Sequence, residues 1–344
     1  MIRVTLRQFR TEAVIGFGLL AVLAIVLAVT GPHLAHVNDA FQSACKAAGD
    51  CATASNPVFE VDKSLQSVLP FIVAIAPALI GLFFGAPLIA RELETGTFRL
   101  AWTQSVTRRR WLAVKLGLVG LGAMAIGGVL TWMVDWWASP LDAANKNRFD
   151  LGPFAWHGVA PIGYAAFAFV LGATAGVLLR RTLPAMAVTL VGFVAARLAI
   201  EHWVRPNLAS PLHESLSLLR TGFGIVGVSA SARTFSLTPP RVIIPNDWVL
   251  STAMVDKSGH ALTGQYFLHA CPAYGQFSSP PQPTQIESAH AACLTKLSST
   301  FHTVVTYQPA SRFWPFQWAE MGIFLAAALA LCGLTYWWLR RQYA

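Results

Sequence analysis

The segment Leu88-Ile-Ala-Arg-Glu-Leu-Glu-Thr-Gly-Thr-Phe-Arg-Leu-Ala-Trp-Thr-Gln-Ser-Val-Thr-Arg-Arg-Arg110 separates two long apolar stretches. No charged residue occurs from Gln66 to Ala90 before it, or from Leu116 to Val134 after it. Each stretch is long enough to cross about 30 Å of hydrocarbon as a helix. The segment between them carries five arginines, two glutamates and a Gly-Thr pair. This charge predicts a cytoplasmic loop, and the composition favours a short helix that contacts another protein.

The composition is that of an integral membrane protein. Of the 344 residues, 55% are hydrophobic and only 12% are charged, and the mean hydropathy is +0.52. Soluble domains carry about twice this charged fraction. We therefore predict an all-α membrane protein with six transmembrane helices, at Ala13–Pro32, Gln66–Ala90, Leu116–Val134, Gly158–Leu179, Thr182–Ala196 (extended to Val204) and Met321–Leu339.

The positively charged residues predict how the chain is oriented in the membrane. With the N-terminus inside, thirteen Lys and Arg residues fall in the inner segments and four in the two short outer loops. Because short cytoplasmic loops are enriched in Lys and Arg, we expect a multi-pass protein with both termini in the cytoplasm. The orientation in the membrane thus accounts for the net charge of +9. Binding of nucleic acid is not expected, because it needs an exposed basic face with interleaved aromatic residues, and the sequence has none.

The chain is predicted to have four parts. Residues 1–12 mix apolar residues with arginines, which is typical of an amphipathic helix on the inner leaflet. Residues 13–204 hold transmembrane helices one to five, with the charged loop at 91–110. Residues 205–315 are predicted to form a mixed extracytoplasmic domain of about 110 residues. Residues 316–344 hold the sixth transmembrane helix and a cytoplasmic tail.

Local patterns predict some detail outside the membrane. In the large outer domain we expect short strands at Arg241–Ile244, Asp247–Leu250 and Phe301–Tyr307, and a helix at Leu212–Leu219. Shorter outer loops are predicted at Gly31–Ser64 and Asp135–His157.

Two pairs of cysteines lie in the predicted outer segments. Paired cysteines outside the cytoplasm predict two disulfides, Cys45–Cys51 and Cys271–Cys293. The alternative is a metal site, because a histidine lies close in sequence to each cysteine of the second pair, at His269 and His290. Thiolate ligands outside the cell compete with oxidation, so we prefer the disulfides and assign no metal.

Two charged residues fall within the fifth predicted span. Arg197 and Glu201 are four residues apart, so an α-helix places them on one face, where they form a possible intramembrane charge pair. Ionisable residues at membrane depth mark functional sites by default. In the alternative interpretation, Glu201 already lies at the outer interface and Arg197 extends toward it.

The charged loop resembles a known family. Its run Arg91-Glu-Leu-Glu-Thr-Gly-Thr-Phe-Arg-Leu100, followed by Gln104-Ser-Val-Thr-Arg108, resembles the Glu-x-x-x-Gly-Thr-x-x-Leu … Pro-x-Ser-Arg segment of ABC type-2 transporter permeases. In that family the segment joins the second and third spans and holds the coupling helix docked on the ATPase. The six spans also match the family, and the run Tyr307–Gln317, followed by a span that ends in Trp-Trp-Leu-Arg-Arg341, looks like an actinobacterial branch of it. The family's proline near Ser105 is absent here, and the outer segment is far longer than usual.

The resemblance implies that residues of this loop contact or orient an ATPase, namely Arg91, Glu92, Glu94, Gly96, Thr97, Phe98, Leu100 and Arg108. Gly96 is expected to set the turn, and Thr97 to cap a short helix. The alternative is a basic loop that only fixes orientation. That alternative accounts for the arginines at 108–110, but not for the two glutamates beside Gly-Thr.

The expected function is that of the permease subunit of an ATP-driven ABC exporter in a bacterial plasma membrane. The chain shows no nucleotide-binding glycine loop and no catalytic triad, so we expect no enzyme activity and no cofactor in this chain. The expected partners are two ABC ATPase subunits that bind ATP and Mg²⁺, a second permease copy or paralogue, membrane lipid, and an amphipathic small-molecule or peptide cargo, as in multidrug efflux. The alternatives are an ion-gradient-driven secondary transporter, which needs inverted repeats and midplane carboxylates, and a membrane-anchored sensor.

Overall fold

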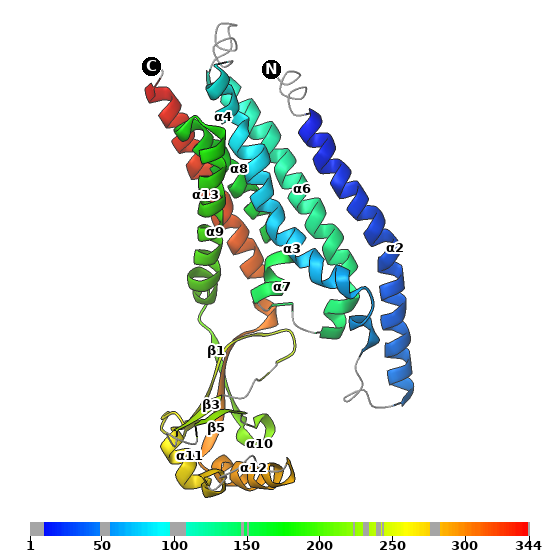
Figure 1. Ribbon diagram of the computed structural model, residues 1–344, viewed down its shortest axis with the longest axis vertical. Coiled ribbons are helices and arrows are strands. Elements are labelled where there is room, and N and C mark those ends of the chain that lie inside the picture. The colour runs from blue at the N-terminus through cyan, green and yellow to red at the C-terminus, as the bar shows by residue number, and fades with distance from the viewer. Residues whose placement is uncertain are drawn as a thin grey trace. The chain divides into compact units, whose positions relative to one another are not determined.

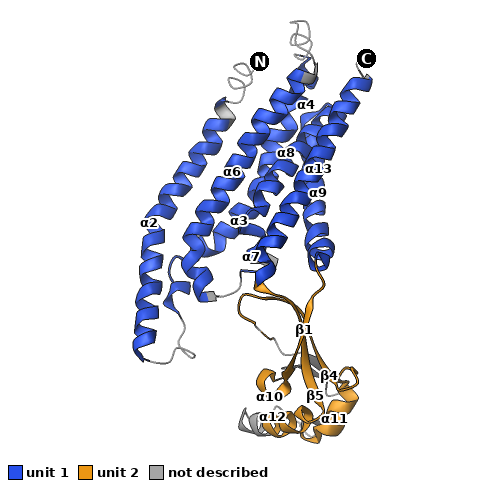
Figure 2. Cartoon of the chain, turned by 180° about the vertical axis from the view of Figure 1, so that it is seen from behind, with its two compact units in different colours: residues 1–208, 311–344 blue, residues 209–310 orange. Residues whose placement is uncertain are grey.

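The computed structural model describes residues 10–48, 56–96, 108–145, 148–149, 151–222, 224–229, 234–238, 242, 244–275 and 283–342. The chain forms two compact units, one of residues 1–208 with 311–344 and the other of residues 209–310 (Figure 2). The segment predicted as the outer domain contains the whole second unit. The predicted interfacial helix at 1–12 lies mostly outside the described residues.

Within the described residues, the first unit holds six helices that are long and apolar enough to cross a membrane (Figure 1). The predicted number of spans is therefore confirmed. The second span consists of two helices joined by a π-helical turn, η2 (Gly81–Gly85). In chain order the helices of the spans are α2 (Arg10–Ala48), α3 (Lys63–Ile80) with α4 (Ala86–Thr95), α6 (Arg108–Asn145), α8 (Ala160–Leu179), α9 (Thr182–Ala199) and α13 (Phe313–Gln342).

Helices α2 and α6 continue beyond the apolar stretches that predicted them. They contain 39 and 38 residues, which is about 57 Å each, against about 30 Å of hydrocarbon. The predicted outer loops at Gly31–Ser64 and Asp135–His157 are therefore largely helical where they are described, and their extent was wrong. Hydropathy marks where a helix leaves the hydrocarbon, and it does not mark where the helix ends.

Helix α8 is the central helix of the first unit. It packs against α3, α4, α6, α9 and α13, and it is apolar on all sides, as a helix enclosed by others must be. Glycines allow the second span to approach it closely. A Cβ at Gly172 would lie 2.4 Å from the carbonyl oxygen of Gly81, and one at Gly85 would lie 2.4 Å from that of Phe169. Gly81 and Gly85 therefore form a face of the second span that packs closely on α8.

The second unit contains an antiparallel three-stranded sheet in the order β1-β5-β4, formed by β1 (Leu212–Ser217), β5 (Phe301–Gln308) and β4 (Trp248–Asp256). A separate two-stranded antiparallel sheet is formed by β2 (Gly224–Ser229) and β3 (Thr234–Thr238). The helices are α10 (Leu218–Thr221), α11 (Gly264–Ala270) and α12 (Pro283–Ser298). Leu212 pairs with Tyr307, so the two ends of this unit lie side by side.

The strands β4 and β5 confirm the strands predicted from Asp247 and from Phe301. The predicted helix at Leu212–Leu219 was wrong, because its first six residues form β1. The backbone of β1 is hydrogen-bonded to β5, about 90 residues later in the chain, and a distant partner of this kind overrides local propensity. In the predicted strand at Arg241–Ile244, the described residues Val242 and Ile244 belong to no strand.

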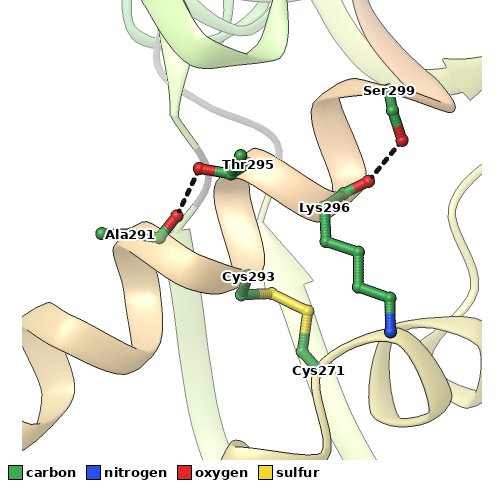
Figure 3. Close-up of a disulfide and its surroundings, with 6 residues drawn as sticks. All are labelled: Cys271, Ala291, Cys293, Thr295, Lys296 and Ser299. Atoms are coloured by element: carbon green, nitrogen blue, oxygen red, sulfur yellow. Dashed lines mark hydrogen bonds between the residues drawn. A yellow bond between two sulfur atoms is a disulfide. The ribbon is translucent and has the colours of Figure 1, made fainter.

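A disulfide joins Cys271, which follows α11, to Cys293 in α12, with 5.2 Å between the Cα atoms (Figure 3). Both cysteines are buried in the core of the second unit. Because each sulfur is bonded to the other, neither is available as a thiolate ligand for a metal. Cys45 lies in α2, but Cys51 lies outside the described residues, so the first disulfide stays a prediction. Cys332 in α13 is a free cysteine.

Candidate functional site

The second span ends in a short helix, α4, that changes from apolar to charged along its length. Leu88 and Ile89 are buried in the first unit, and the charged residues follow one turn later. Gly96 then ends the helix with φ 73°, in the left-handed region where glycine is favoured. A Cβ at Gly96 would meet nothing within 4 Å, so backbone conformation alone favours glycine here. The turn expected at Gly96 is present.

The structure describes five of the eight residues that the resemblance singled out. Arg91, Glu92 and Glu94 lie on α4, Gly96 ends this helix, and Arg108 begins α6. The other three, Thr97, Phe98 and Leu100, lie outside the described residues, as does the predicted capping of a short helix.

Glu92 forms an ion pair with Lys115, two turns into α6. The side chain of Lys115 is only 4% exposed, and its ammonium group lies 4.9 Å from the centre of the Trp111 ring. A buried ammonium group without a partner is strongly destabilising, since it has lost its hydration without gaining a counter-charge. The Glu92 carboxylate therefore holds the end of the second span against the start of the third.

Glu94 contacts the start of the fifth span. Its Oε2 atom accepts a hydrogen bond of 2.9 Å from the Thr182 hydroxyl and one of 3.3 Å from the Thr182 backbone N–H. Thr182 is the first residue of α9, whose N-terminal N–H groups lack partners within the helix. A carboxylate at this position satisfies such a donor and lies at the positive end of the helix dipole. Glu94 thus caps α9 from another helix.

The two glutamates are therefore linked to the third and fifth spans at one end of the first unit. Neither Lys115 nor Thr182 was singled out from the sequence. Lys115 could have been noticed in the sequence, because it is the last charged residue before the apolar stretch of the third span. Nothing in the sequence indicated the role of Thr182, because its partner Glu94 is 88 residues away in the chain.

A second group of charges lies deep in the first unit, around Glu320 of α13. Arg205 donates to both of its carboxylate oxygens, at 2.9 and 3.0 Å. The Tyr164 hydroxyl donates to Oε1 at 2.5 Å, and Arg197 Nη1 lies 3.5 Å from the same oxygen. Glu320 and Arg205 are almost completely buried. This buried group joins α8, α9 and α13 through one carboxylate.

This group corrects the pair predicted from the sequence. Arg197 and Glu201 form no ion pair in the described structure, and Arg197 pairs with Glu320 instead. Glu201 lies in a π-helical turn, η3 (Ile200–Val204). That turn has a wider repeat than an α-helix, so a spacing of four residues no longer places two side chains on one face.

A buried histidine links α6 to the segment before α8. The fully buried His157 imidazole is hydrogen-bonded through Nδ1 to Asp135, and its Nε2 lies 3.3 Å from Asp142 Oδ1. Burial by itself lowers the pKa of His157, but the hydrogen bonds and charges of the two aspartates outweigh it, and the pKa is raised above its ordinary value. No pattern in the sequence predicts this role of His157.

An open groove of about 660 Å³ runs between α2, α3 and α6. Every residue that lines it is apolar or glycine, with Leu19, Phe71 and Phe83 among them. The groove offers no polar group that distinguishes one ligand from another.

The six long apolar helices of the described residues define a membrane-embedded protein. Comparison with known proteins specifies the class further. A family model described as ABC-2 membrane transporter related matches residues 17–205, which is more than half of the chain. The chain belongs to this family, as the resemblance of its charged loop implies. No curated protein matches the chain, and no solved structure matches it either.

Proposed function

We propose that this chain is the permease subunit of an ATP-driven exporter, which forms the substrate pathway with a second permease and is driven by two ABC ATPase subunits. Family membership supports a transporter membrane subunit and, in general, association with ABC ATPases. The observation that carries the proposal is α4, which ends at Gly96 and bears two acidic residues joined to the third and fifth spans.

The proposed orientation is that of the sequence analysis, with both termini in the cytoplasm of a bacterium. The even number of spans and the excess of Lys and Arg in the proposed inner segments support it. In this orientation the second unit lies outside the cytoplasm. Its disulfide supports that location, because disulfides persist in oxidising compartments.

In the proposed mechanism, closure of the ATPases pushes the loop between α4 and α6, and the spans rearrange so that cargo is released outward. The proposed cargo is amphipathic, either a small molecule or a peptide. No residue of the chain is assigned to ATP or Mg²⁺, which the partner ATPases bind.

The test is recovery of the tagged full-length chain from its native membranes in mild detergent, followed by mass spectrometry. We expect an ABC ATPase in about equal amount to the permease. The variant Glu94→Lys reverses an exposed charge on α4 and is expected to lower the recovery of this ATPase. Glu60→Lys reverses an exposed charge of the ion pair with Lys63, at the other end of the second span, and is the matched control.

Recovery of the folded permease without any ATPase contradicts the proposal. Transport that follows an ion gradient in proteoliposomes, with no requirement for ATP, supports the alternative of a secondary transporter instead.

A further inference from the structure

The loop between α4 and α6 has its two ends joined by an ion pair. Glu92 lies one turn before Gly96, and Lys115 lies two turns after Arg108. Because Lys115 is buried, the pair is shielded from water and from screening by salt. The end of α4 and the start of α6 are therefore fixed to each other. A force on the loop is carried by α4 and α6 together.

The turn between α8 and α9 is joined to the same helix. It is very short: Arg180 has a left-handed conformation with φ 55°, Arg181 is extended, and α9 starts at Thr182. Glu94 of α4 accepts hydrogen bonds from both the hydroxyl and the backbone N–H of Thr182. The start of the fifth span therefore has a direct polar contact with the end of the second.

The second span contains a π-helical turn about which α4 could tilt. The π-helical turn η2 lies directly before α4, and π-turns within helices occur frequently at functional sites. On the next turns, α4 is in close contact with α8, since a Cβ at Gly176 would lie 2.7 Å from the carbonyl oxygen of Ala86. Sliding of α4 along α8 is restricted by this contact, whereas tilting about η2 moves the end of α4 that carries Glu92 and Glu94, together with their partners on α6 and α9.

From these contacts we infer that Lys115 and Thr182 are positioning residues for coupling. Lys115 holds the base of the loop rigid, and Thr182 passes the displacement of α4 to the fifth span. The inference rests on the proposed function, because it needs an ATPase that acts on the loop. It adds that the two glutamates of α4 act on the permease itself, through named partners on α6 and α9.

The experiment uses the permease together with its ATPase in lipid nanodiscs. Spin labels are placed on His36→Cys in α2 and Asn207→Cys just beyond the fifth span, in a Cys332→Ala background, where a label count of two per chain excludes reaction at other cysteines. Both labelled positions are exposed. The distance between the labels is measured without nucleotide and after trapping with ATP and vanadate.

We expect the distance to change on trapping in the otherwise unsubstituted protein. Lys115→Met is expected to abolish the change, and Thr182→Val, which keeps only the longer backbone hydrogen bond to Glu94, is expected to reduce it, while the ATPase stays bound in both. The charge swap Glu92→Lys with Lys115→Glu, and the conservative variant Thr182→Ser, are expected to restore it. Lys63→Met removes an exposed ion pair with Glu60 and is expected to leave the change intact.

The possible failures can be told apart. A bound ATPase with no change of distance on trapping, or a full change in both Lys115→Met and Thr182→Val, overturns the inference and leaves the proposed function standing. Absence of any bound ATPase contradicts the proposed function itself. A Lys115→Met protein that does not fold is replaced by the charge swap, whose loss of the change would also count against the inference.

Discussion

At the scale of single residues, one carboxylate balances two guanidinium groups, of which that of Arg205 is buried and that of Arg197 is partly buried. Glu320 receives two hydrogen bonds from Arg205, one from Tyr164 and an ion pair from Arg197. The rings of Phe154 and Tyr164 lie 4.3 and 3.9 Å from the two guanidinium carbons. Cation–π contacts of this kind are stronger away from water. The arginines therefore have other favourable contacts, whereas among the described residues Glu320 is the only acid that pairs with both.

We predict that Glu320→Gln is the most destabilising single substitution in this group. It leaves the buried Arg205 and the partly buried Arg197 without their counter-charge, and removal of one partner of a buried pair costs about 3–5 kcal/mol. Thermal unfolding in detergent should show a larger loss for Glu320→Gln than for Arg197→Met. Glu201→Gln is the control, and a loss equal to that of Glu320→Gln would restore the Arg197–Glu201 pair as the important one.

The raised pKa of His157 predicts that the stability of the fold depends on pH. Its pKa is raised in the folded chain above the unfolded value of about 6.5. Protonation then stabilises the fold fully below that unfolded value, and this contribution is lost as pH rises through the folded pKa. The charged groups around the imidazole are Asp135 and Asp142, and Arg148 lies 3.3 Å from Asp142.

The measurement is the melting temperature of wild type and His157→Gln between about pH 5 and pH 9. Wild type should lose stability across the upper part of this range. The melting temperature of the variant should be lower at the acidic end of the range and should change less with pH. Parallel curves for the two proteins would show that His157 does not titrate in this range.

At the scale of elements, the sequence predicted features that are local and missed those that depend on distant partners. Apolar length located the spans, and a glycine after two acidic residues located the end of α4. Glu92 and Glu94 were recognised by their motif, but their partners on α6 and α9 were not. The strand β1 was taken for a helix, because its pairing with β5 leaves no trace in six residues. The π-helical turn that contains Glu201 could not be recognised from the sequence either.

Close packing of α8 against the second span predicts that two glycine-to-alanine substitutions differ sharply in their effect on stability. Gly172→Ala places a Cβ 2.4 Å from the Gly81 oxygen and 2.7 Å from the Ala86 nitrogen. These are backbone atoms that cannot move aside, and overpacking of this kind costs about 1–3 kcal/mol. Gly117→Ala in α6 meets nothing within 4 Å and is expected to be neutral or slightly stabilising, since alanine favours helix. Thermal unfolding of the two variants checks the contrast, and equal behaviour contradicts it.

At the scale of the whole molecule, the second unit is an insertion between the fifth and sixth spans. Because β1 and β5 pair along their length, the chain enters and leaves this unit at neighbouring positions. A deletion of residues 212–307 joined by a short flexible linker is therefore expected to preserve the first unit. We predict that the deletion protein still recovers the ATPase from membranes, since α4 and its partners are unchanged. Loss of the ATPase would show that the second unit takes part in assembly.

The same deletion tests whether the second unit gates release of cargo. A gate predicts that ATP hydrolysis by the assembled complex no longer responds to cargo once the unit is removed. A peripheral addition predicts no change in transport rate or in the range of cargo.

The cysteines predict a defined thiol count. Alkylation of the denatured, unreduced protein followed by mass measurement should modify Cys332 and leave Cys271 and Cys293 unmodified. The sequence prediction adds Cys45 and Cys51 to the unmodified set. Closing a loop of 22 residues stabilises the unit by about 3 kcal/mol in the chain-entropy model, so reduction should lower its melting temperature. Alkylation of Cys271 and Cys293 without reductant would contradict the disulfide.

The arrangement around Glu320 also has a consequence for biogenesis. Arg205 and Glu320 are 115 residues apart in the chain, so a ribosome working at about 5–20 residues per second completes the fifth span roughly ten seconds before the acid emerges. During that interval Arg197 and Arg205 lack the carboxylate that pairs with both of them in the folded chain. A nascent chain interrupted before Glu320 would thus lack this shared counter-charge, and the contact that joins the fifth and sixth spans could not form.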